Sequence, residues 1–117
     1  MRVVTGLLAT TLLAVTACSG GADAITSDGD GVEVVVTITD DSTDPSGAVV
    51  RVERGEEITV RITSDIDDEV HVHSEPDHSF PVTPGQETVE TFSIDTPGTF
   101  PMESHRLDLV IVKFEVS

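Results

Sequence analysis

Histidines are the residues with the clearest chemical potential in this chain, and three of the four fall in one short segment, EVHVHSEPDH (Glu69–His78). The fourth, His105, ends the segment PMESH, two residues after Glu103. Alternate residues of a β-strand project from the same face, so His71 and His73 share a face if their segment is extended, as do Glu103 and His105. Imidazole nitrogens and carboxylate oxygens suit borderline divalent cations such as Cu(II) and Zn(II). The two segments therefore predict a metal site, provided that the fold makes them neighbours.

Each of these residues also has an ordinary interpretation. Histidines on a solvated sheet face can be polar surface residues, and Glu103 with His105 can be a surface ion pair. His78 lies in SEPDHSF, which is typical of a loop, and Met102 suits a core position, although both stay open as further ligands. Ser104 and His105 are adjacent and so face opposite sides of a strand, which argues against a nucleophile with its base. The sequence predicts no enzymatic activity.

The chain is strongly acidic. Its 117 residues include 22 Asp and Glu against 6 Lys and Arg, which gives a formal charge of -16. Such a surface repels phosphate backbones and anionic headgroups, so nucleic-acid binding is not expected. With four Phe and neither Trp nor Tyr, the chain also has few aromatic side chains on which bases stack. We interpret the charge as a solvated face that maintains solubility and that would attract cations or basic partners.

The first residues have the pattern of an export signal. Met1 and Arg2 give a positive start, Val3–Val15 is apolar but short for a membrane-spanning helix, and small residues lead to Cys18. The segment resembles a bacterial lipoprotein signal, in which the cysteine of a Leu/Val-x-Ala/Gly-Cys box is lipidated and becomes the new N-terminus. Because Cys18 is the only cysteine, the domain has no intramolecular disulfide and no thiolate for a metal or for catalysis. We expect residues 1–17 to be a signal peptide and Cys18 to carry the lipid; the alternative is a secreted protein with one free thiol.

Composition divides the rest of the chain into a tether and a domain. Residues 18–31, CSGGADAITSDGDG, hold almost nothing to bury and predict a flexible linker, which leaves 32–117 as one domain. Within the domain, short alternating apolar runs are separated by Pro/Gly turns, and no segment shows a sustained helical period. This pattern favours an all-β sandwich or Greek-key barrel. The expected strands are Val32–Ile38, Ala48–Glu53, Ile58–Ile62, Val70–Val72, Val89–Ile94, Thr99–Ser104 and Val110–Val116.

The order of the segments resembles the cupredoxin fold, most closely the small cupredoxin-like domains of exported bacterial proteins. The segments are, in order, RGEEITVRITSD, EVHVH, TPGQETVETFSID, TPGTFPMESH and VIVKFEVS. The resemblance covers nearly all of 32–117 and implies a Greek-key β-sandwich. Cupredoxins of the blue-copper type bind copper through an early histidine and a later group of Cys, His and Met before the last strand. His71 matches the early histidine, whereas Ser104 or a neighbour stands where the cysteine would be. The resemblance thus implies that the two histidine segments are neighbours and that the blue-copper thiolate is absent.

Together these observations predict a lipid-anchored cupredoxin-like domain on the extracytoplasmic face of the cell membrane, which it would contact only through the anchor. We expect the domain to bind copper, with zinc as the alternative metal, through His71, His73, Glu103 and His105, in a carrier or sensing role. The second interpretation is a metal-free β-sandwich that serves as an interaction or accessory module and retains a vestigial site.

Overall fold

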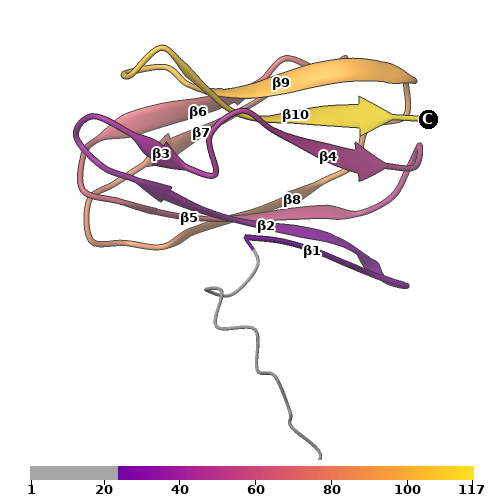
Figure 1. Ribbon diagram of the computed structural model, residues 1–117, viewed down its shortest axis with the longest axis horizontal. Helices are drawn as coiled ribbons and strands as arrows, with labels where there is room; N and C mark the ends of the chain where they lie inside the picture. The colour runs from indigo at the N-terminus through magenta and orange to yellow at the C-terminus, as the bar shows by residue number, and fades with distance from the viewer. Residues whose placement is uncertain (1–23) are drawn as a thin grey trace, which may run out of the picture.

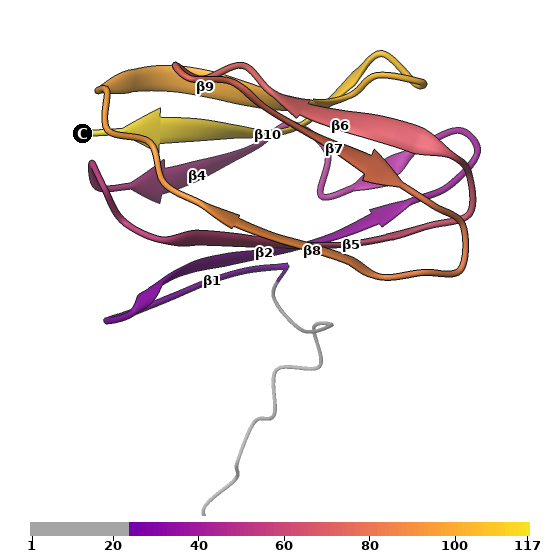
Figure 2. The same ribbon diagram turned by 180° about the vertical axis from the view of Figure 1, so that it is seen from behind.

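The computed structural model describes residues 24–117, which form two β-sheets packed face to face (Figure 1). One sheet has the order β1-β2-β5-β8, with β3 also paired to β2, and the other has the order β4-β10-β9-β6-β7. Figure 2 shows the same layers from behind, with β7 and β8 on the near side. No helix in this part of the chain is long and apolar enough to cross a membrane. The strands are β1 (Ile25–Asp28), β2 (Gly31–Ile38), β3 (Thr43–Asp44), β4 (Ala48–Val52), β5 (Ile58–Ser64), β6 (Asp68–Val72), β7 (His78–Val82), β8 (Thr88–Phe92), β9 (Gly98–Ser104) and β10 (Leu109–Val116).

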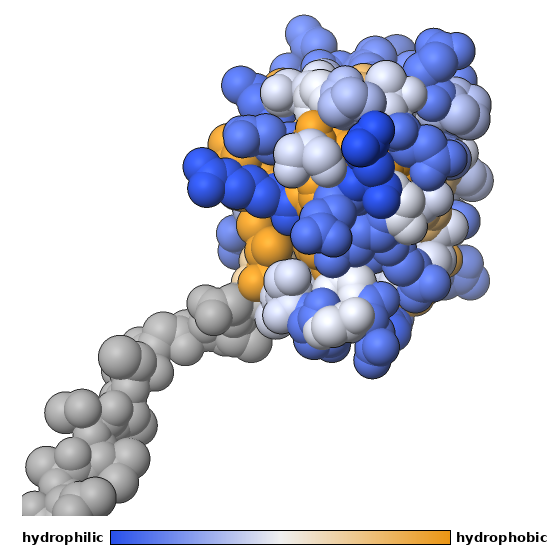
Figure 3. Space-filling view, turned by 90° about the vertical axis from the view of Figure 1, so that its right-hand side faces the viewer, coloured by the Kyte–Doolittle hydropathy of each residue, from blue (hydrophilic) through white to orange (hydrophobic). Residues whose placement is uncertain are grey.

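The alternation of apolar and polar residues decides which face of each strand is buried. In β2, every second residue from Val32 to Ile38 is buried, and β5 repeats this pattern from Ile58. Burying one such side chain stabilises a fold by about 1.5–3 kcal/mol, so the two apolar faces pack against each other. At the end of the sandwich seen in Figure 3, hydrophilic side chains cover most of the surface. The largest side chains buried in the core are Phe114, Ile38, Ile58, Ile62, Ile94, Met102 and Ile111.

The predicted all-β sandwich is confirmed, and each of the seven predicted segments contains a strand. The sequence pattern misses β3, which has only two residues, and β7, HSFPV. Pro81 weakens the strand signal of β7, because proline cannot donate a ladder hydrogen bond. β7 tolerates it because this strand is at the edge of its sheet, paired only with β6.

The predicted tether must be shortened at its C-terminal end. Residues assigned to it form β1, which pairs antiparallel with β2 from Ile25 opposite Val34 to Asp28 opposite Gly31. The Asp30 N–H donates to Asp28 Oδ1 at 2.8 Å and closes the hairpin turn. An added edge strand needs backbone hydrogen bonds rather than an apolar run, so composition alone does not reveal it. The predicted signal peptide, Cys18 and the tether up to residue 23 lie outside the described residues.

Candidate metal centre

The strands that carry the two histidine segments are neighbours. β6 pairs antiparallel with β9, and the register sets His71 opposite Glu103 and Val72 opposite Met102. On the other side of β6, Ser79 of β7 is opposite His71. Residues paired across antiparallel strands share a face, and Val72 and Met102 are buried in the core. His71 and Glu103 therefore project from the outer face of the sandwich, and the predicted proximity of the two segments is confirmed.

His71 and His73 lie side by side on this outer face. Their ring centroids are 4.1 Å apart and their planes are inclined by 42°. The Nε2–H of His71 donates to Asp77 Oδ2 at 2.9 Å, and Asp77 belongs to the loop between β6 and β7. Because this hydrogen bond favours the charged carboxylate, it holds the pKa of Asp77 below its ordinary value of 3.8. The first imidazole thus has an anionic oxygen directly beside it.

The second imidazole is bound by a carboxylate from the neighbouring strand. The Nε2–H of His73 donates to Glu103 Oε2 at 2.9 Å. The side chains of this pair are 45% and 35% exposed, and those of the His71–Asp77 pair are 28% and 68% exposed. Pairs this accessible contribute on the order of 0–1 kcal/mol to stability. Stability alone is therefore a weak reason for two such pairs to lie next to each other.

His105 lies further along the sheet. Its backbone N–H donates to the carbonyl of Glu69 at 2.9 Å, so it is opposite a residue two positions before His71. The backbone N–H of His73 donates instead to the carbonyl of Pro101 at 2.9 Å. His105, the first residue after β9, is four residues beyond that carbonyl, about 13 Å at roughly 3.4 Å per residue. His71, His73 and Glu103 are thus neighbours, whereas His105 is separated from His73 along the sheet.

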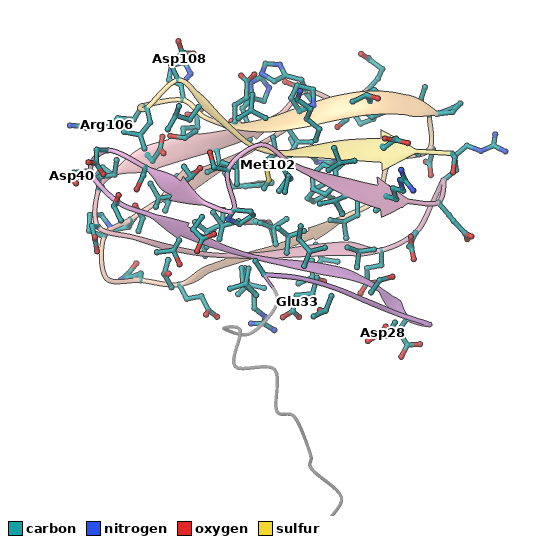
Figure 4. All side chains as sticks on the ribbon, in the orientation of Figure 1. Asp28, Glu33, Asp40, Met102, Arg106 and Asp108 are labelled. Atoms are coloured by element: carbon teal, nitrogen blue, oxygen red, sulfur yellow. The ribbon has the colours of Figure 1, made fainter. Side chains whose placement is uncertain are left out.

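The turn that carries His105 is held by Asp68. The Asp68 carboxylate accepts hydrogen bonds from Ser104 Oγ at 2.5 Å and from the Arg106 N–H at 2.9 Å, and Ser104 Oγ accepts one from the Leu107 N–H at 3.2 Å. Ser104 is fully buried, whereas Arg106 lies at the tip of the turn (Figure 4). The hydroxyl that stands near the place of a blue-copper cysteine therefore organises this turn.

The two further candidate ligands face the interior. Met102 is 0% exposed and lies between the two sheets (Figure 4). His78 begins β7 opposite the buried Val72, and its ring stacks on Phe92 with centroids 4.7 Å apart. Neither side chain shares the outer face with His71.

Asp77 is the residue of this centre that the sequence analysis missed. The connection from β6 to β7 reverses the chain, and within it the Ser74 hydroxyl donates to the carbonyl of Pro76 at 2.8 Å. This reversal returns Asp77 to the ring of His71, six residues earlier. The signal available in the sequence was an acid immediately before an alternating run, HSFPV, on the same hairpin as the histidines.

The donor set on this face fits a borderline divalent cation and not blue copper. Two imidazoles with carboxylates form a nitrogen and oxygen set that suits Cu(II) or Zn(II), whereas blue copper requires two histidines with a cysteine thiolate. The donors are arranged as two hydrogen-bonded pairs. Within residues 24–117, no group of three or more His, Cys, Asp and Glu side chains is close enough to hold a metal ion as it stands. Holding copper or zinc here requires the pairs to rotate toward each other.

No family model and no curated protein matches this sequence. Solved structures with a similar fold include the metal-binding domain of the Cu(I)-exporting P-type ATPase CopA of Streptococcus pneumoniae, at a TM-score of 0.61 and 10% identity, covering 80% of this chain and 92% of that one. A copper binding protein studied in its apo form has a TM-score of 0.57 at 11% identity, covering 80% and 94%. A heme-copper terminal oxidase has a TM-score of 0.56 at 17% identity, covering 76% of this chain and 66% of its own.

Likeness at these identities concerns the backbone arrangement and not the ligands. The two small copper-related domains are matched over almost their whole length, and the oxidase chain over slightly less than two thirds of its length. The two mixed sheets packed face to face agree with this likeness. Residues 24–117 have a cupredoxin-like fold.

Proposed function

We propose that this protein binds copper(II), or a similar divalent metal such as zinc(II), in a carrier or sensing role. The observation that carries the proposal is the pair of adjacent imidazoles of His71 and His73, 4.1 Å apart, with Glu103 hydrogen-bonded to one of them on an accessible face. The proposed ligands are these three residues; the sequence also predicted His105 as a ligand. The fold shared with two small copper-related domains supports the choice of metal.

The ligand chemistry favours ion exchange over electron transfer. Nitrogen and oxygen donors alone suit Cu(II) and Zn(II) and lack the soft ligands that Cu(I) prefers. All of the proposed side chains are partly or fully exposed, so a bound ion would remain accessible to a partner. The proposal includes no catalytic step, which is supported by Ser104 being buried and hydrogen-bonded to Asp68.

We place the protein on the extracytoplasmic face of the cell membrane, anchored by a lipid on Cys18. The support is the sequence of residues 1–18, in which an apolar run ends in small residues before the only cysteine. A formal charge of -16 on the chain would keep the domain off anionic headgroups, so the lipid would be its only contact with the membrane.

Thermal melting tests the metal site. A ligand at a hundredfold excess over its dissociation constant stabilises the native state by about 2.7 kcal/mol, which for a domain of this size raises the Tm by roughly 10 °C or more. We expect Cu(II) or Zn(II) to raise the Tm of the purified chain, followed by circular dichroism because the chain has neither Trp nor Tyr. Bound Cu(II) should lack intense blue colour, since no thiolate is within the domain.

The matched variants are His71→Ala/His73→Ala and, as a control, His78→Ala. The double variant should lose the metal-dependent shift, while the control should retain it, because His78 faces the core against Phe92. Absence of a shift with either metal, or a shift that survives in the double variant, would remove the basis for the proposal.

A second candidate function is a metal-free interaction or accessory module. It is favoured by the two imidazoles each being satisfied by a carboxylate, with no preassembled metal group among residues 24–117. The melting experiment separates the two functions, because the Tm of a metal-free module does not change when Cu(II) or Zn(II) is added. Its His71→Ala/His73→Ala variant would differ from the parent only in the Tm measured without metal.

A further inference from the structure

The position of His105 is difficult to reconcile with a single ion shared with His73. The backbone hydrogen bonds set the two residues four positions apart along the sheet, about 13 Å at roughly 3.4 Å per residue, and His105 is the first residue of the turn after β9. For both imidazoles to reach one ion they would have to lie flat along the sheet toward each other. Another group must therefore complete a site that contains both His71 and His73.

Asp77 is the group that the structure places there. Its Oδ2 is 2.9 Å from His71 Nε2, its side chain is 68% exposed, and among the described residues its only side-chain partner is that imidazole. The next carboxylate on this face, Glu69, lies on the His105 side of His71, and its Oε1 accepts a hydrogen bond from Ser79 Oγ at 2.8 Å. The Glu69 carboxylate is thus bonded to Ser79, and its residue is four positions before His73 on the chain.

The spacing within each pair matches that of neighbouring atoms around one ion. Zinc ligands lie about 2.0–2.2 Å from the metal, so two of them at angles of roughly 90–110° are about 2.9–3.5 Å apart. The nitrogen-to-oxygen distance is 2.9 Å in both the His71–Asp77 and the His73–Glu103 pair. The two rings are also adjacent, and a shared ion would require the exposed side chains of the two pairs to rotate toward each other.

The net charge of the ligand set also favours Asp77 over His105. Two neutral imidazoles with two carboxylates compensate the charge of a divalent cation completely. Three imidazoles with Glu103 alone would leave one positive charge uncompensated. We propose that Asp77, and not His105, is the fourth ligand, so that His71, Asp77, His73 and Glu103 hold one divalent cation on the outer face of the β6–β9 strand pair. This inference rests on the metal-binding function proposed above.

Calorimetric titration with Cu(II) and with Zn(II) tests the assignment on the purified chain. We expect Asp77→Asn to weaken binding at least tenfold, while His105→Ala stays within about threefold of the parent. Glu75→Gln is the matched control, because it removes a carboxylate from the same loop at an exposed position with no side-chain hydrogen bond among the described residues. The control should also stay within about threefold.

Electron paramagnetic resonance of bound Cu(II) distinguishes a ligand from a residue that only orients His71. The parent chain and His105→Ala should both show coupling to two nitrogens. Asp77→His should add a third nitrogen if position 77 coordinates the ion, and should leave two if it does not.

The outcomes separate this inference from the proposed function. If the parent chain binds neither metal, the proposed function fails and the inference with it. If the parent binds and His71→Ala/His73→Ala does not, the function stands. Loss of binding in His105→Ala with retention in Asp77→Asn, or a third nitrogen in the parent that His105→Ala removes, would then overturn the assignment of Asp77 alone.

Discussion

The hydrogen bonds of Asp68 predict a large loss of stability when its carboxylate is removed. In Asp68→Ala the buried Ser104 hydroxyl loses its acceptor, and leaving a buried polar group unsatisfied costs about 1–3 kcal/mol. The bond from the Arg106 N–H is at an exposed turn, where water can replace the carboxylate, so we assign it at most about 1 kcal/mol. The expected loss is about 1–4 kcal/mol, or a Tm lower by roughly 4–30 °C for a domain of this size.

Urea unfolding followed by circular dichroism measures this loss. Asp67→Asn is the matched control, since it removes the same charge from the adjacent exposed residue and should change stability by about 0.5 kcal/mol or less. Asp68→Asn should fall between the two, because its amide keeps one acceptor oxygen. If Asp68→Ala costs no more than the Asp67→Asn control, the carboxylate does not hold the β9–β10 turn, and our account of that turn is wrong.

Three further predictions concern the lipid anchor, the stability of the fold at low pH and one glycine. Cys18→Ser should release the protein from membranes or block its processing, and membrane fractionation unchanged from the parent would contradict the lipid anchor. Carboxyl NMR should show a pKa of Asp77 below 3.8, and in His71→Ala this pKa should return toward 3.8. Because the pKa is lowered in the folded state, the stabilisation from this pair is present above pH 3.8 and is lost as the pH falls through the folded-state pKa of Asp77. Gly31→Ala should be strongly destabilising in thermal melts, because its φ is 145° and a Cβ would meet a backbone oxygen at 2.5 Å, while Gly29→Ala, with open space around it, should be tolerated.

The sandwich itself follows from local patterns. Alternating valines and isoleucines in β2 and β5, with Pro/Gly turns between strands, define one apolar face per strand, and two such sheets can bury those faces only against each other. The same patterns do not report β1 or β7. These strands are at the edges of their sheets and are held there by backbone pairing, which is almost independent of side-chain type.

For the site, the sequence by itself determined which donors share a face within one strand, because the period of two is a property of the extended backbone. His71 with His73, and the outward direction of Glu103 against the buried Met102, follow from that period alone. Only the tertiary structure decided the register between β6 and β9, which puts Glu103 opposite His71 and His105 farther along the sheet. It also decided that a chain reversal brings Asp77 to His71, because contacts between strands depend on how the whole sandwich closes and leave no periodic signal in the chain.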